Sequence, residues 1–143
     1  LNIIENKLSE LGLSWAYYSE KEKLKESQVV IINKIGILAN LYKYSDLAYV
    51  GAGFGAGVHS VIEPAVYKNV VSFGPNYQIV DMAVSLVEDE LTSVINNSED
   101  FVQFLTLFSN PDNLEKYKGK MAHFISEQKL ASDAIIKAIF TDE

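Results

Sequence analysis

The chain has 143 residues, a formal net charge of −7 and no cysteine. This length fits one domain with a hydrophobic core, and the acidic balance argues against nucleic-acid binding and adsorption to an anionic membrane. Without cysteine the chain has no disulfide framework or thiolate metal site, and its two histidines do not favour a histidine-rich metal site. No apolar run approaches the ~18–20 residues of a membrane span, so we expect no direct membrane insertion.

Short apolar runs alternate with helical patterns along the first two thirds of the chain. Strands are predicted at 14–19, 29–33, 47–50, 70–74 and 91–95, and helices at 2–11, 35–44, 61–67 and 79–87. The run Val29-Val30-Ile31-Ile32 is β-branched throughout, which is typical of a strand buried on both faces of a parallel sheet. The alternation predicts an α/β fold, with a Rossmann-like parallel sheet and helices on both of its faces.

The residue pattern of the carboxyl third predicts helices. Asn97 and Ser98 are predicted to cap one helix, and Asn110-Pro111 is predicted to start another. Apolar residues recur at roughly helical spacing at Phe101, Phe104, Leu105, Phe108, Leu114, Tyr117, Met121, Phe124, Ile125, Ile135, Ile136 and Ile139. Such a stripe can line a partner groove, but its core-facing pattern favours packing on the sheet.

A glycine-rich turn follows the third predicted strand. Gly51, Gly53, Gly55 and Gly57 alternate with other residues just before a predicted helix. Glycine permits positive φ and close approach of a ligand, and a helix start offers free N–H groups to an anion. The turn lacks the lysine of a P-loop and follows the wrong strand for a dinucleotide fingerprint. We therefore predict an anion-binding loop of another kind.

The residues after the glycines leave two interpretations open. Ser60-Val61-Ile62-Glu63 has the form of a capping box, in which the two side chains bond each other's backbone N–H. Glu63 can equally be a ligand-binding residue. His59 stands where turn and helix meet and can donate a hydrogen bond to phosphate or carboxylate, whereas His123 is predicted to be a helix-face residue.

A second turn, Phe73-Gly74-Pro75-Asn76-Tyr77, follows the fourth predicted strand. Its composition is good turn chemistry in its own right. It also opens at the carboxyl edge of the sheet, where open α/β sheets bind ligands. Two such loops from neighbouring strands predict a cleft.

The order and spacing of these motifs resemble one family. Residues 35–51, with Tyr42, Tyr44 and Asp46, then the glycine turn with His59-Ser60-x-x-Glu63-Pro64-Ala65, then residues 73–77, are similar to the 3-deoxy-D-manno-octulosonic acid (Kdo) transferases of lipopolysaccharide assembly. The match is specific from about Asn33 to Tyr77. It lies in the carboxyl-terminal half of that two-domain enzyme.

The resemblance implies a GT-B architecture, in which this domain binds the donor CMP-Kdo and an amino-terminal domain presents the lipid A precursor. By position, the expected donor-binding residues are Gly51, Gly53, Phe54, Gly55, Gly57, His59, Ser60, Glu63 and Asn76, with Glu63 near the ribose. A carboxylate suits a diol because it accepts charge-assisted bonds from both hydroxyls. No metal and no cofactor are implied. The parent enzyme is expected at the cytoplasmic face of the bacterial inner membrane, with this part in the cytosol.

The resemblance also has departures. The family usually has Asn at Ser60, Gly at Lys68 and Asp at Asn33. Its catalytic glutamate and Pro-Arg-His segment have no counterpart here, so no catalytic residue is assigned. We expect residues 1–143 to be one donor-nucleotide-binding domain, truncated at its amino end and inactive alone. A GT-B transferase domain for another sugar nucleotide, and a non-catalytic interaction module, are the alternatives.

Overall fold

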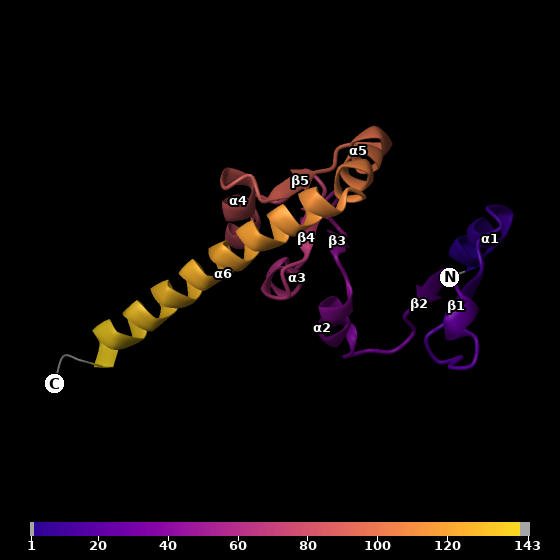
Figure 1. The fold of residues 1–143 in the computed structure, drawn as a ribbon, viewed down its shortest axis with the longest axis horizontal. Helices are drawn as coiled ribbons and strands as arrows, with labels where there is room; N and C mark the ends of the chain where they lie inside the picture. Colours follow the sequence, from indigo (N-terminus) through magenta and orange to yellow (C-terminus); the bar gives the residue numbers. More distant parts are fainter. Residues whose placement is uncertain (1, 141–143) are drawn as a thin grey trace. The chain divides into compact units, whose positions relative to one another are not determined.

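The computed structural model describes the backbone of residues 2–140 and the side chains of residues 2–128. The chain forms two compact units, Leu1–Leu38 and Ala39–Glu143. Every strand paired in either unit is parallel to its neighbour, with β1 beside β2 in one sheet and the order β3-β4-β5 in the other. Figure 1 shows the elements of each unit.

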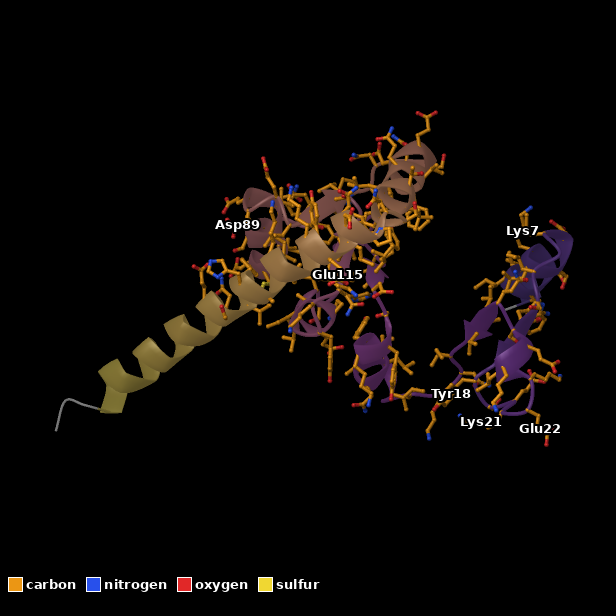
Figure 2. All side chains as sticks on the ribbon, viewed as in Figure 1. Lys7, Tyr18, Lys21, Glu22, Asp89 and Glu115 are labelled. Carbon is orange, nitrogen blue, oxygen red and sulfur yellow. The ribbon has the colours of Figure 1, made fainter. Side chains whose placement is uncertain are left out.

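The first unit contains α1 (Asn2–Glu10), β1 (Trp15–Tyr17), a 3-10 turn η1 (Leu24–Glu26) and β2 (Val29–Ile31). Ala16 in β1 is fully buried, whereas Val30 is 38% exposed despite the β-branched run around it. The Lys21 ammonium lies 3.2 Å from the ring centroid of Tyr18, and both residues are labelled in Figure 2. A two-stranded sheet offers little surface for burial, which explains the exposed strand.

The second unit is built on three parallel strands. α2 (Leu38–Leu41) and a 3-10 turn η2 (Tyr42–Tyr44) lead into β3 (Leu47–Val50), followed by α3 (Ile62–Val66) and β4 (Val70–Phe73). Next come α4 (Asp81–Glu88), β5 (Thr92–Val94), α5 (Ser98–Phe108) and α6 (Pro111–Phe140). All four residues of the central strand β4 are buried.

Two hydrophobic clusters cover the two faces of this sheet. Val71 and Phe73 of β4 pack in one cluster, with Ala65 of α3, Leu86 of α4 and Met121 of α6. On the other face, the second cluster contains Val70, Ile95, Phe104 and Phe108, and Tyr117 packs against it. The alternation along β4 sends successive side chains to opposite faces. Helices therefore cover both faces.

The predicted α/β fold with parallel strands and helices on both faces is confirmed. Each predicted strand and helix is present, most with shorter bounds, while β3 has the predicted bounds and α4 ends one residue later than predicted, at Glu88. The predicted helix at 35–44 begins only at Leu38, because Gly36 adopts φ 81 in the left-handed region. The parallel strands form two sheets instead of one. Among the described residues, no helix combines the length and the apolar character needed to cross a bilayer.

The predicted caps and most of the apolar stripe are also confirmed. Asn97 Oδ1 accepts the N–H groups of Glu99 and Asp100, and Asn110 Oδ1 accepts that of Asp112 at 2.9 Å. Phe104, Phe108, Met121 and Phe124 are buried. The prediction was wrong for Leu105, which is 43% exposed because it turns away from the sheet side of α5. The side chains of Ile135, Ile136 and Ile139 lie outside the described residues.

Candidate functional site

Two loops start side by side at the carboxyl edge of the three-stranded sheet (Figure 1). β3 ends at Val50 and β4 ends at Phe73, and these two residues are register partners. Residues 51–61 then connect to α3, and residues 74–80 connect to α4. The loops named in the sequence as ligand-binding candidates are thus neighbours at the predicted edge.

The two loops touch through their glycines. A Cβ atom added to Gly53 would lie 2.6 Å from the backbone nitrogen of Gly74, and one added to Gly74 would lie 2.7 Å from the carbonyl carbon of Gly53. Both residues are buried. Real Cβ contacts do not come this close, so neither position accepts a side chain without backbone movement. This contact fixes the spacing of the loops.

Asn76 stabilises the contact between the two loops with three hydrogen bonds. Its backbone N–H donates to the Gly53 carbonyl at 2.8 Å, and its carbonyl accepts the Val58 N–H at 3.0 Å. Its side-chain Nδ2 donates to the Gly55 carbonyl at 3.1 Å. The predicted ligand-binding residue Asn76 is therefore a brace for the glycine loop in this structure. A direct contact from Asn76 to a ligand stays a prediction.

The four glycines of the turn have different roles. Gly57 adopts φ 115, which favours glycine, and a Cβ there would lie 2.4 Å from Ile79 Cδ1. Gly51 has open space around its Cα. Gly55 also lacks a close neighbour, since its nearest atom to a built Cβ is 3.9 Å away. Packing thus explains why Gly53 and Gly57 carry no side chain. At Gly51 and Gly55 the lack of a side chain leaves the loop backbone exposed.

His59, Ser60 and Glu63 are exposed, and the buried Val58 and Val61 anchor the segment that carries the first two. The predicted capping box is wrong. α3 begins at Ile62 with Val61 as its N-cap, and no side chain bonds the free N–H groups there. Val61 is fully buried in the core, and the helix begins one residue later than a cap at Ser60 would place it. Glu63 is therefore free of the capping role.

Backbone donors remain open along the loop. In the described chain, the N–H groups of Gly55 and Val58 are bonded to loop carbonyls, but those of Phe54, Ala56 and Ser60 have no hydrogen-bond partner. Unpaired N–H groups at the surface need water or a ligand acceptor. Since α3 has only five residues, these loop donors, and not a helix dipole, are the features suited to an anion.

Sequence reasoning missed Tyr42 as a neighbour of this segment. The pKa of Tyr42 is raised, chiefly by burial and further by the negative charge of Glu63. The phenol of a tyrosine is an O–H donor at neutral pH. η2 packs against α3 in this unit. The two residues are 21 positions apart, so only the fold brings them together.

A shallow hollow of about 490 Å³ lies at the same edge of the sheet. It is lined by Tyr49, Phe54, Ile95, Asn96, Asn97, Ser98 and Phe101. The Tyr49 and Phe101 rings meet edge to face at 5.6 Å, and Phe54 is 57% exposed. This wall is mainly apolar and carries no ionised side chain. Of its residues, only Phe54 was predicted to take part in a site.

The fold and this edge define a class, the Rossmann-like carboxyl-terminal domains of GT-B proteins. The structure matches the C-terminal CMP-Kdo binding domain of WaaA from Acinetobacter baumannii with a TM-score of 0.73. The two chains are 19% identical, and the match covers 87% of this chain and 67% of the other. At this identity the likeness establishes the fold.

Sequence relatives agree with the resemblance to Kdo transferases, which is confirmed. The chain is 29% identical over 133 residues to a 3-deoxy-D-manno-octulosonic acid transferase from Chlamydophila psittaci, covering 91% of this chain and 31% of that protein. It is 24% identical over 115 residues to the transferase of the same description from Rickettsia felis, covering 78% of this chain and 25% of that protein.

A third relative has a different description. It is a bifunctional glycosyltransferase/methyltransferase from Fusobacterium nucleatum, 30% identical over 139 residues, covering 94% of this chain and 21% of that protein. The chain thus spans a fifth to a third of the length of these relatives. No family model matches it. The chain is related to glycosyltransferases, and Kdo transferases are among its homologues.

Proposed function

We propose that this chain is the donor-binding part of a glycosyltransferase that transfers Kdo from CMP-Kdo to a lipid A precursor. The observation that carries the proposal is the pair of loops locked by Gly53, Gly74 and Asn76 at the carboxyl edge of the sheet. Open α/β sheets bind their ligands at this edge. The glycine loop presents unpaired N–H groups there, as a phosphate requires.

The exposed side chains beside the loop suit the rest of a sugar nucleotide. His59 and Ser60 offer hydrogen bonds to phosphate or to the carboxylate of Kdo. Glu63, released from capping, offers two carboxylate oxygens to the ribose diol. The bare backbone at Gly51 and Gly55 lets the donor approach closely. Phe54, on the rim of the apolar hollow, is the remaining predicted contact.

We place no catalytic residue in this chain. Inverting transfer needs a base that activates the acceptor hydroxyl, while donor-side groups stabilise the departing CMP. In this proposal the base and the lipid A precursor come from an amino-terminal domain of the parent enzyme, at the cytoplasmic face of the inner membrane. The 143 residues alone then bind the donor and do not catalyse the transfer.

Calorimetric titration with CMP tests the proposal. We expect binding to the chain, and weaker binding, by about tenfold, to Glu63→Ala, because a charge-assisted bond to the diol is lost. Gly55→Val should also weaken binding by shielding the loop N–H groups, with little loss of fold because the position has space. Glu88→Ala, on the exposed end of α4, is the matched control. Equal affinity in all four proteins would remove the loop and Glu63 from the site.

The Fusobacterium nucleatum relative supports a second candidate, a GT-B domain that uses another sugar nucleotide. Melting shifts with CMP, UMP, UDP and ADP at equal concentration separate the two, since ligand binding raises the melting temperature according to affinity. The Kdo proposal requires the largest shift with CMP. A larger shift with UDP or ADP favours the second candidate, and no shift with any nucleotide favours a non-catalytic module.

A further inference from the structure

The outer strand of the three-stranded sheet has an open edge. β5 is the last strand in the order β3-β4-β5, so within the described residues no strand pairs with its far side. The Ile95 N–H donates to the Phe73 carbonyl of β4 at 2.8 Å. Because alternate residues of a strand bond the same neighbour, the N–H and C=O groups of Val94 point away from β4. An added strand can pair with such groups.

A groove of about 500 Å³ lies along this edge. Ser93 and Val94 both line it. Since successive side chains of a strand point to opposite faces, the groove follows the edge of β5 and not one face of the sheet. The opposite wall is one face of α5, formed at helical spacing by Asp100, Gln103, Phe104 and Leu107. Phe104 is buried and Leu107 is 41% exposed, so this wall offers apolar surface to a ligand.

Acidic side chains lie at both ends of the edge. Residues 69–115 contain eight acidic side chains and no lysine, arginine or histidine, whereas the rest of the chain carries 11 acidic and 12 basic side chains. The three acidic residues 88–90 are exposed just before β5, and Figure 2 labels Asp89 there. Among the described side chains, none of the three forms an ion pair. Asp100 lies at the other end, where its Oδ2 accepts the Asn96 N–H at 2.9 Å.

We infer that the β5 edge and the α5 wall bind an extended peptide segment with an apolar centre and basic residues at both ends. Its backbone pairs with Val94, its apolar side chains pack on Phe104 and Leu107, and its cations match the acidic residues at the two ends. Peptides add to sheet edges in this way, with main-chain bonds for affinity and alternate side chains for specificity. A second copy of this chain fits poorly, because it brings like charges together.

A synthetic probe tests this inference on the intact chain. The probe is a capped, dye-labelled heptapeptide with two lysines at each end and Val-Thr-Val in the centre, and its binding is followed by fluorescence anisotropy. We expect binding that weakens at least tenfold when glutamates replace the lysines. N-methylation at alternate amides should show a period of two, with one set weakening binding about three- to tenfold per lost bond and the other set much less.

Two sets of chain variants test the surface itself. Val94→Pro removes the open N–H at a place where an edge strand accepts proline, and should weaken binding about three- to tenfold. Glu88→Gln with Glu90→Gln should weaken it about two- to fivefold, as for exposed ion pairs. Glu22→Gln with Glu26→Gln in the first unit makes the same change of net charge and should leave the affinity unchanged.

Amide NMR of the unmodified chain locates the peptide without any variant. The Val94 N–H should shift and exchange more slowly with solvent when the peptide is added. The Ser93 N–H faces β4 and should change little. Peptide binding with unchanged Val94 exchange would show association by charge alone and would overturn the inference.

The remaining outcomes also decide. No binding, or equal binding of the lysine and glutamate peptides, contradicts the inference. Dimerisation that protects the Val94 N–H without peptide assigns the edge to a second copy and overturns the peptide as its occupant. The inference does not depend on nucleotide binding, so a chain that binds CMP and not the peptide keeps the proposed function and loses only this site.

Discussion

The two compact units use the same kinds of element but bury very different amounts of apolar surface. In the first unit, Ala16 is the buried apolar residue among the described side chains, while Ile3 is 85% and Ile35 100% exposed. The second unit closes two clusters around β4, including the fully buried Phe73. Both units have parallel strands and β-branched runs. The number of helices packed on the strands, and not the strand sequence, sets the burial.

The comparison also places the candidate site. Every predicted ligand-binding residue lies in the second unit, on the loops that follow β3 and β4 or, for Glu63, in the first turn of α3. A binding loop needs a rigid support, because a site whose contacts are about 1 Å too loose does not bind its ligand well. The Gly53–Gly74 contact supplies that support, together with the hydrogen bonds from the buried Asn69 side chain to the Tyr42 and Pro64 carbonyls.

The core of the second unit should dominate stability. Phe73→Ala removes a fully buried ring and should lower the free energy of unfolding by about 3–5 kcal/mol. Ile3→Ala on the exposed face of α1 should change it by less than about 0.5 kcal/mol. Urea unfolding followed by far-UV circular dichroism measures both.

Trp15 adds a local probe, because it is the one tryptophan and lies in the first unit. Its fluorescence transition should stay in place in Phe73→Ala while the dichroism transition moves to lower urea. If the two transitions move together, the units unfold as one and the contrast between them is wrong.

The loop contact should be the next most sensitive feature. Gly74→Ala forces a Cβ against the Gly53 backbone and should cost about 1–3 kcal/mol, as overpacking does. Gly12→Ala in the first unit meets no atom within 4 Å and loses only about 1 kcal/mol for its positive φ. Thermal melting of both variants checks this order. A smaller loss in Gly74→Ala than in Gly12→Ala would show that the loops can separate freely.

Lys68 marks a strained turn between α3 and β4. It adopts φ 63, a left-handed conformation that favours glycine, and the resembling family usually has glycine there. Lys68→Gly should therefore raise the free energy of unfolding by up to about 1 kcal/mol. Lys68→Ala, which keeps the strain, should give no gain. Thermal melting measures the stability of both variants. A gain in stability with Lys68→Ala would assign the effect to the lost charge.

Acid should lower the stability of both units, through one carboxylate in each. The pKa of Asp100 is lowered, chiefly by the Asn96 backbone N–H, and the pKa of Glu20 is lowered, chiefly by the Lys23 ammonium. A lowered folded-state pKa gives stability that is present above the ordinary values of 3.8 and 4.5. This stability is lost as the pH falls through the lower folded values.

Added salt then distinguishes the stability contributed by Glu20 from the stability contributed by Asp100. The exposed Glu20–Lys23 pair, 2.5 Å apart, should weaken in 0.5 M salt because exposed charges are screened. The bond from the Asn96 N–H to Asp100 should persist, since its donor is an uncharged amide. Melting curves of Asp100→Asn and Glu20→Gln between pH 2 and 5 test this, and an equal salt effect on both would contradict it.

Residue pattern alone was sufficient for the elements and for the edge of the sheet that carries the candidate loops. The β-branched and apolar runs predicted the five strands, and Asn97 and Asn110 predicted two helix starts correctly. The capping box at Ser60 failed because local sequence does not include the burial of Val61, which is the N-cap of α3 instead. Val30 is exposed although its β-branched run predicts burial. The reason is the same, because the residues that would bury it come from elsewhere in the fold.

The sequence by itself determined the α/β order of elements, the glycine-rich turn and its resemblance to Kdo transferases, because these depend on short-range spacing. Tertiary structure alone decided which glycines are required by packing, and that Asn76 braces the loop. It also decided that Asn69 joins Tyr42 to the residue beside Glu63. These contacts join residues 5 to 27 positions apart, and their distances depend on how the strands pair and the helices pack.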